Sequence, residues 1–201
     1  MRHIVLLGDS IFDNAAYVRG GPDVVTQLRA LLPADARATL LAVDGAVTAD
    51  VARQLGRLPP DATDLVLSVG GNDALRHMDL LQRRARNGAE VLAWFADALA
   101  PFEAGYRALL GALVGPGRAV TVCTIYDGHL EPALRRPARA GVALFDDVIQ
   151  RLARAADVPV IELRDVCSEA DDYANPIEPS VQGGAKIAAA ILRQLLRAGG
   201  P

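Results

Sequence analysis

The chain has 201 residues, of which 51% are hydrophobic, and this is enough for one domain with a buried core. Its formal net charge is −3, so it lacks the basic field typical of nucleic-acid-binding proteins. No apolar run reaches the ~18 residues of a membrane span, and the N-terminus shows no signal-peptide pattern. We therefore expect one cytoplasmic domain over residues 1–201, with no nucleic-acid or membrane partner. The oligomeric state stays open.

Strand-like and helix-like stretches alternate along the chain, as in proteins built from βαβ units around a parallel sheet. We expect strands at residues 3–7, 39–43, 64–69, 119–125 and 158–163. Helices are expected around residues 24–32, 46–58, 74–114, 142–156 and 182–197, with Pro101 kinking or dividing the longest one. A polar loop over residues 164–179 precedes the last helix, for which Ser180 is a candidate N-cap. The sequence thus predicts an α/β fold.

The first strand leads directly to a candidate nucleophile. Gly8 ends the apolar run, and Asp9 and Ser10 follow at once. In open α/β sheets ligands bind at the carboxyl ends of the strands, so the Ser10 hydroxyl is expected where chemistry usually takes place. Asp9 is a candidate acceptor for backbone N–H groups of this turn, or a group that contacts substrate.

Three further places follow predicted strands or precede a helix, and we expect all of them at the same edge of the sheet as Ser10. Gly45 follows the second strand, and Asn72 follows the third in Gly-Gly-Asn-Asp. The segment 175–180 precedes the last helix. The arrangement suggests acyl transfer, because the N–H groups of Ser10 and Gly45 and the Asn72 amide are the donors that an oxyanion needs.

The order of these blocks resembles the SGNH, or GDSL, hydrolase superfamily. Gly8-Asp9-Ser10 matches its first block, Gly45 its second, and Gly70-Gly71-Asn72-Asp73 its third, over nearly the whole chain. The resemblance implies a three-layer α/β/α sandwich with a five-stranded parallel sheet. It also implies a serine hydrolase of small acyl esters that needs no metal or cofactor.

The last block departs from the family pattern. Where Asp-x-x-His-Pro is expected, the chain has Asn175-Pro-Ile-Glu178-Pro, so Glu178 stands in the place of the histidine. A carboxylate with an ordinary pKa near 4.3 is a poor base for serine, but burial raises that pKa. Asn175 is then a candidate to orient Glu178. The alternative is a protein that has lost catalysis and binds small molecules of the acyl or carbohydrate type.

Several other residues are candidates for minor roles. His129, just beyond the fourth strand, is a second candidate base, whereas His3 and His77 are expected at the surface. Asp13 and Tyr17 either line the substrate pocket or cap and pack the following helix. The two cysteines are expected to be reduced and buried. A nucleotide-binding function is not indicated, because the chain has neither a dinucleotide fingerprint nor a P-loop.

Overall fold

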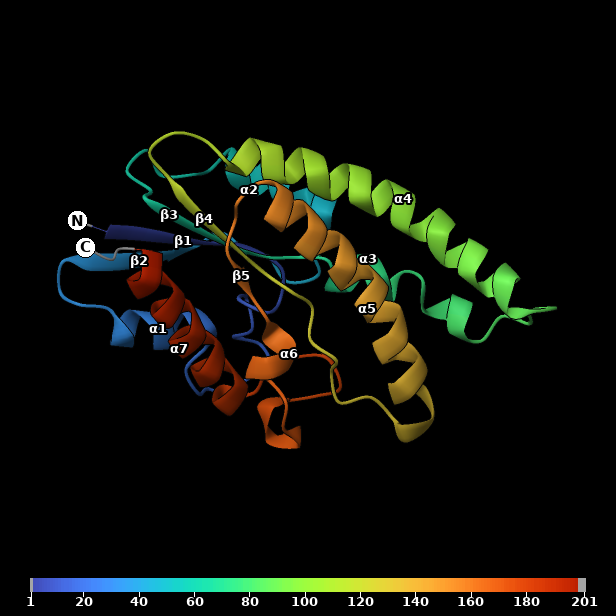
Figure 1. The fold of residues 1–201 in the computed structure, drawn as a ribbon. Helices are drawn as coiled ribbons and strands as arrows, with labels where there is room; N and C mark the ends of the chain where they lie inside the picture. The colour runs from blue at the N-terminus through green and yellow to red at the C-terminus, as the bar shows by residue number, and fades with distance from the viewer. Residues whose placement is uncertain (1, 199–201) are drawn as a thin grey trace.

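The computed structural model describes residues 2–198, which form a five-stranded sheet in the order β2-β1-β3-β4-β5 (Figure 1). All four strand pairs are parallel. The strands are β1 (Arg2–Gly8), β2 (Ala36–Leu40), β3 (Asp64–Ser68), β4 (Ala119–Cys123) and β5 (Val160–Ile161). The strand order reverses between β1 and β3, and such switch points open a crevice at the carboxyl ends of the strands. The predicted α/β fold with a parallel sheet is confirmed.

Helices cover both faces of the sheet, because the central strands are apolar on both sides. One face carries α1 (Val24–Leu31), α6 (Leu163–Val166) and α7 (Val181–Ala198). The other carries α2 (Val51–Leu55), α4 (Gly88–Leu113) and α5 (Pro132–Ala155). Ile4 and Leu6 of β1 pack in the core on the side of α1, α6 and α7, and Val5 and Leu7 pack in the core on the side of α2, α4 and α5. Figure 1 shows α1 and α7 on one side of the sheet and α2 and α4 on the other.

The second strand lies earlier than the sequence predicts. Regular pairing with β1 ends at Leu40, and the N–H groups of Leu41 and Ala42 then both donate to the Leu6 carbonyl. A shared acceptor interrupts the ladder, so the predicted strand at residues 39–43 is displaced to Ala36–Leu40. A 3₁₀ turn, Thr48–Asp50, precedes α2 and shortens the helix expected at residues 46–58.

The predicted helix at residues 74–114 is wrong at its start. The chain forms α3 (Gly71–Leu75), a 3₁₀ turn (Met78–Leu81) and then α4. Asn87 caps α4 by accepting from the Glu90 N–H at 3.0 Å, which explains where the long helix begins. Pro101 lies inside α4 without dividing it. Pro101 and Asp97, whose carbonyl loses its partner, are both exposed, so water replaces the missing hydrogen bond.

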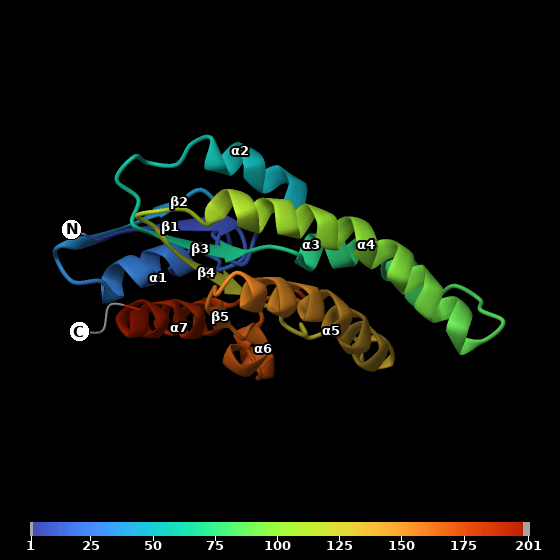
Figure 2. The same ribbon diagram turned by 45° about the horizontal axis from the view of Figure 1, so that its top comes forward.

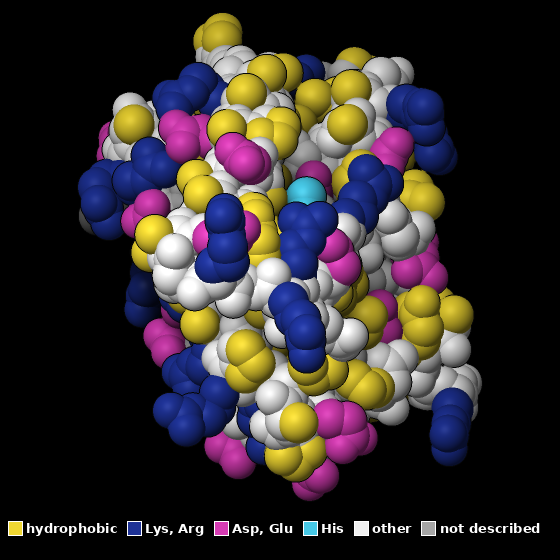
Figure 3. Space-filling model, turned by 90° about the vertical axis from the view of Figure 1, so that its right-hand side faces the viewer, with side chains coloured by type: hydrophobic (Ala, Val, Ile, Leu, Met, Phe, Trp, Pro, Cys, Tyr) yellow, Lys and Arg dark blue, Asp and Glu magenta, His cyan; other side chains and the backbone are white. Residues whose placement is uncertain are grey.

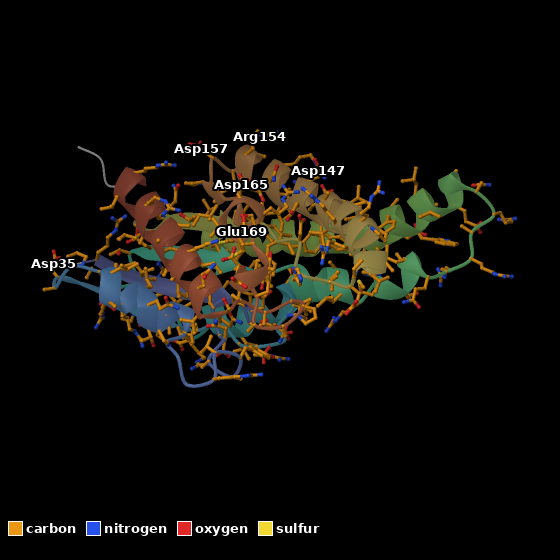
Figure 4. The ribbon with its side chains drawn as sticks, turned by 90° about the horizontal axis from the view of Figure 1, so that it is seen from below. Asp35, Asp147, Arg154, Asp157, Asp165 and Glu169 are labelled. Atoms are coloured by element: carbon orange, nitrogen blue, oxygen red, sulfur yellow. The ribbon has the colours of Figure 1, made fainter. Side chains whose placement is uncertain are left out.

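Helix α5 begins ten residues earlier than expected, at Pro132 rather than at residue 142. Proline fits the first turn of a helix, because the N–H that it lacks would be unpaired there. Figure 2 shows α4 and α5 running beyond the sheet past the carboxyl ends of its strands. Figure 4 labels two of the exposed charged side chains, Asp147 of α5 and Asp165 of α6. Within residues 2–198 no helix is long and apolar enough to cross a membrane.

Candidate active site

The turn after β1 is fixed by contacts with β3 and α2. Gly8 has a φ of 123°, and a Cβ there would lie 1.8 Å from the Ser68 carbonyl oxygen, so only glycine fits. The buried Gln54 amide accepts from the Gly8 N–H and donates to the Gly8 carbonyl, both at 2.8 Å. The Asp9 N–H donates to Ser68 at 3.1 Å. These contacts set the position at which Ser10 leaves the sheet.

Ser10 and Glu178 meet at this edge. The Ser10 hydroxyl donates to Glu178 Oε1 at 3.0 Å, and the two residues are only 7% and 5% exposed. Burial raises the pKa of Glu178 to about 7, although the Ser10 hydrogen bond opposes the rise. The second oxygen, Oε2, is buried and has no hydrogen-bond partner among residues 2–198. A carboxylate in this position can accept the serine proton near neutral pH.

The turn that carries Glu178 is held through its backbone. Asn175 Oδ1 accepts from the N–H groups of Ile177 and Glu178 at 2.9 and 3.0 Å. The Tyr126 hydroxyl donates to the Ile177 carbonyl at 2.7 Å, and the His129 N–H donates to the Pro176 carbonyl at 2.8 Å. Asn175 therefore positions Glu178 by folding the turn, and not by a hydrogen bond to the carboxylate.

The structure places the His129 imidazole away from Ser10. The exposed ring stacks on Tyr173 with centroids 6.4 Å apart and faces a separate polar cavity between α5 and α6. It forms no contact with Ser10 or Glu178 that would let it accept the serine proton. This geometry does not support His129 as the alternative base.

Asp9 acts within its own turn. Its Oδ1 accepts from the Ile11 N–H at 3.1 Å, as the sequence suggested. Burial, reinforced by the nearby charge of Glu178, raises the pKa of Asp9 to about 8. The Asp9 carboxyl group is thus mainly protonated at neutral pH.

The candidate oxyanion donors lie in the turn after β1, the loop after β2 and the short helix α3. Asn72 Nδ2 donates to the Ala46 carbonyl at 3.0 Å, and its amide has a second N–H. Gly45 adopts a φ of 77° and is exposed. Within residues 2–198 the N–H groups of Ser10 and Gly45 donate no hydrogen bond. Asp73 of α3 connects this helix to the 3₁₀ turn that follows Gly45. Its carboxylate accepts hydrogen bonds from the N–H and the hydroxyl of Thr48, both at 3.0 Å.

Asp13 and Tyr17 both bond to Asp44, beside Gly45. Asp13 Oδ2 accepts from the Asp44 N–H at 2.9 Å, and the Tyr17 hydroxyl donates to Asp44 Oδ2 at 2.8 Å. The Asp44 hydrogen bond is the main cause that raises the pKa of Tyr17 to about 12. Both side chains hold the Gly45 loop, and their contact with substrate stays a prediction.

Two histidines differ from the surface positions expected of them. His3 is buried and hydrogen-bonded to Thr39 and Asp61 at 2.8 and 3.0 Å, at the opposite end of β1 from Ser10. His77 is half-buried and lines the same cavity as Ser10. The cysteines are free and buried, as expected. No group of three or more metal-ligating side chains occurs among residues 2–198.

Two positioning residues were missed by the sequence reasoning. In the sequence Gln54 is an ordinary polar residue of a predicted helix. In the structure its side chain forms hydrogen bonds with both the N–H and the carbonyl of Gly8. Asn14 is fully buried and links two distant segments, since its side chain donates to the Pro179 carbonyl and accepts from the Val24 N–H. An uncharged amide carries no sequence signal of such a contact.

Comparisons with known proteins show the family to which the chain belongs. The model of the GDSL-like lipase/acylhydrolase family matches residues 6–185, and the chain belongs to this family of ester hydrolases. No curated protein sequence matches the chain significantly.

Solved structures share the fold at low sequence identity. An acetyl xylan esterase, AlAXEase, is 17% identical with a TM-score of 0.73, over 96% of this chain and 99% of that one. A putative arylesterase from Agrobacterium tumefaciens is 15% identical with a TM-score of 0.73, over 98% and 99%. Phospholipase A1 from Streptomyces albidoflavus is 16% identical with a TM-score of 0.70, over 96% and 98%. These likenesses establish the fold and leave the substrate open.

Proposed function

We propose that this protein hydrolyses carboxylic esters with Ser10 as nucleophile and Glu178 as general base. The 3.0 Å hydrogen bond from the Ser10 hydroxyl to Glu178 carries the proposal. It joins a hydroxyl and a buried carboxyl group at the carboxyl edge of the sheet, and Asn72 lines the same cavity. Membership of an ester hydrolase family supports the reaction class.

The mechanism needs one proton acceptor and a site for the oxyanion. Ser10 Oγ attacks the ester carbonyl carbon while its proton passes to Glu178 Oε1, and the carbonyl oxygen becomes the oxyanion. The N–H groups of Ser10 and Gly45 and the Asn72 amide are the proposed donors to that oxygen. Collapse of the intermediate breaks the bond to the alcohol, which leaves with the proton from Glu178. Water then attacks the acyl-enzyme, Glu178 takes the water's proton, and Ser10 departs with that proton as the acid is released.

The environment of Glu178 supports its role as base. A pKa of about 7 brings its proton affinity closer to that of histidine than an exposed glutamate could. Protonated Asp9 adds no negative charge beside the reacting serine at neutral pH. The exchange of histidine for glutamate is therefore compatible with catalysis in this site.

A fluorophosphonate probe tests the proposal, because labelling requires an activated serine hydroxyl. We expect wild type to be labelled and to hydrolyse p-nitrophenyl acetate, and Ser10→Ala to lose both properties while keeping its thermal melt. Ser180→Ala, which alters a helix-capping serine, is the matched control and should still be labelled. An unlabelled, inert wild type would instead favour the small-molecule binding protein.

A further inference from the structure

The cavity beside Ser10 has a polar end and an apolar end. The segments that follow β1 and β3 and the turn before α7 supply its reactive polar groups, which include Ser10, Asn72 and Glu178. The helices beyond the sheet edge supply mainly apolar side chains: Leu75, Met78, Leu81, Phe95, Val142 and Phe145. These come from α3, the following 3₁₀ turn, α4 and α5, the elements that extend past the sheet in Figure 2.

Two polar side chains, His77 and Asp127, line the cavity among these apolar ones, and among residues 2–198 Asp127 Oδ1 is buried without a hydrogen-bond partner. The His77 ring stacks on Phe145 with centroids 6.3 Å apart, and Asp127 pairs with Arg139 at 3.1 Å. A sugar would need a larger set of converging hydrogen-bond donors and acceptors than His77 and the one free oxygen of Asp127 provide. A hydrocarbon chain needs only apolar contact, and its burial is favourable at each methylene. Figure 3, which views the molecule from the end where α4 and α5 begin, shows apolar side chains reaching the surface between arginines.

We infer that the helical end of this cavity binds the acyl chain of the substrate, and that the preferred acyl group is an unbranched chain of medium length rather than acetyl. The inference rests on the proposed function for the ester chemistry. The acyl group stays bonded to Ser10 after the alcohol has left, so an apolar recess behind the serine suits the acyl chain.

Gly141 of α5 lies close to Phe95 of α4 in the wall of the cavity. A Cβ at Gly141 would lie 3.3 Å from the Phe95 ring, and both residues line the cavity. A larger side chain at Gly141 should therefore fill the recess, whereas a smaller one at Phe95 should extend it. Gly111 of α4 offers a matched control, since it is a helical glycine with open space around its Cβ position.

The test is kcat/KM for p-nitrophenyl acetate, butyrate, hexanoate, octanoate and decanoate. In wild type, kcat/KM should rise by about three- to fourfold for each methylene that enters the recess. Gly141→Leu should lose at least tenfold on octanoate and stay within twofold on acetate, with Gly111→Leu unchanged on both. Phe95→Ala should move the preference towards decanoate, and it decides the matter if Gly141→Leu does not fold.

Other outcomes would overturn the inference. One is an active wild type whose kcat/KM does not rise from acetate to octanoate. Another is a kcat/KM that rises with the length of the alcohol, from ethyl to octyl acetate, and not with the length of the acyl chain. An unchanged chain-length profile in Phe95→Ala would also count against it. If wild type hydrolyses no ester, the proposed function fails separately, and calorimetry with sodium octanoate decides: binding that Gly141→Leu abolishes supports the acyl recess, and no binding overturns it.

Discussion

At the scale of single residues, burial determines whether Glu178 can serve as a base. The carboxylate of an exposed glutamate is about two pKa units less basic than histidine. Water stabilises the ionised carboxylate, so removal of that water raises the pKa of the group. Glu178 loses most of that water, and its Oε2 gains no partner in exchange. The same burial that makes the group more basic leaves it protonated in part at pH 7.

The first prediction is a pH–rate profile governed by Glu178. Only ionised Glu178 accepts the serine proton, so kcat/KM should increase with pH through about 7, the pKa to which burial raises this group. Glu178→Gln should lose most of the activity, since an amide cannot take up the proton. The measurement is kcat/KM between pH 5 and 9 for both proteins, and an active Glu178→Gln protein would contradict the assignment.

The double variant Asn175→Asp, Glu178→His provides the comparison for that profile. It restores the residues of the family pattern, and its rate should turn near ~6.5, the ordinary histidine value. Glu169→Gln is a matched control, because Glu169 is an exposed carboxylate distant from Ser10 in the polar cavity near α6. It should reproduce the wild-type profile.

Asn72 carries the second prediction. If its free N–H contacts the developing oxyanion, Asn72→Ala should lower kcat by about 10²–10³-fold with little change in KM. Asn87→Ala, which removes a helix cap at the start of α4, should lower stability instead of kcat. A higher KM with unchanged kcat for Asn72→Ala would place this side chain in ground-state binding.

At the scale of elements, α2 acts on the active site through the exit of β1. Gln54 holds the N–H and the carbonyl of Gly8, two residues before Ser10. Because the Gly8 carbonyl also accepts from the Val43 N–H at 3.0 Å, the Gly8 N–H is the group that depends on Gln54. A helix that carries none of the proposed catalytic residues thus positions Ser10, the proposed nucleophile.

The third prediction follows from that contact. Gln54→Leu keeps the size of the side chain but leaves the Gly8 N–H buried and unpaired, which should cost about 1–3 kcal/mol of unfolding free energy. The turn should also become less ordered, so kcat should fall more than KM rises. Denaturant melts and steady-state kinetics measure both effects, with the exposed Gln82→Leu as control. Unchanged stability and kcat in Gln54→Leu would show that α2 does not hold the turn.

At the scale of the whole molecule, three buried carboxyl groups lower the free energy of unfolding as the pH rises. Burial is the main cause that raises the pKa of Asp9 to about 8 and those of Asp146 and Glu178 to about 7. Between about pH 5 and 8 these groups are therefore more protonated in the folded chain than in the unfolded chain. Raising the pH through this window then removes protons that only the folded state holds, and the free energy of unfolding decreases.

The fourth prediction is a lower melting temperature at pH 8.5 than at pH 5.5. Asp9→Asn should reduce this difference, because the amide keeps an acceptor for the Ile11 N–H and has no proton to lose. Asp35→Asn is the matched control, since Asp35 lies exposed at the far end of the molecule (Figure 4). A wild-type melting temperature that rises over this pH interval would contradict the pKa assignments.

The sequence by itself determined the fold class, the strand exits at Ser10 and Asn72, and the block that contains Glu178. These features depend on local signals: apolar runs of strand length, glycines at turns, and polar residues directly after them. The end of β2 at Leu40 was not predicted, because the Leu6 carbonyl that interrupts the ladder belongs to a distant segment. The start of α4 at Gly88 was missed although its cap, Asn87, lies next to it in the sequence.

Only the tertiary structure decided which of these residues lie together and which are buried. Ser10 and Glu178 are 168 positions apart, and their contact requires the parallel order of the strands and the packing of α7 to be in place. Several elements together bury Asp9 and Glu178 and so set their pKa values. The packing of the same fold separates His129 from Ser10 and brings Gln54 into hydrogen-bond contact with Gly8. Desolvation is a property of everything that surrounds a group, so no local pattern in the chain encodes it.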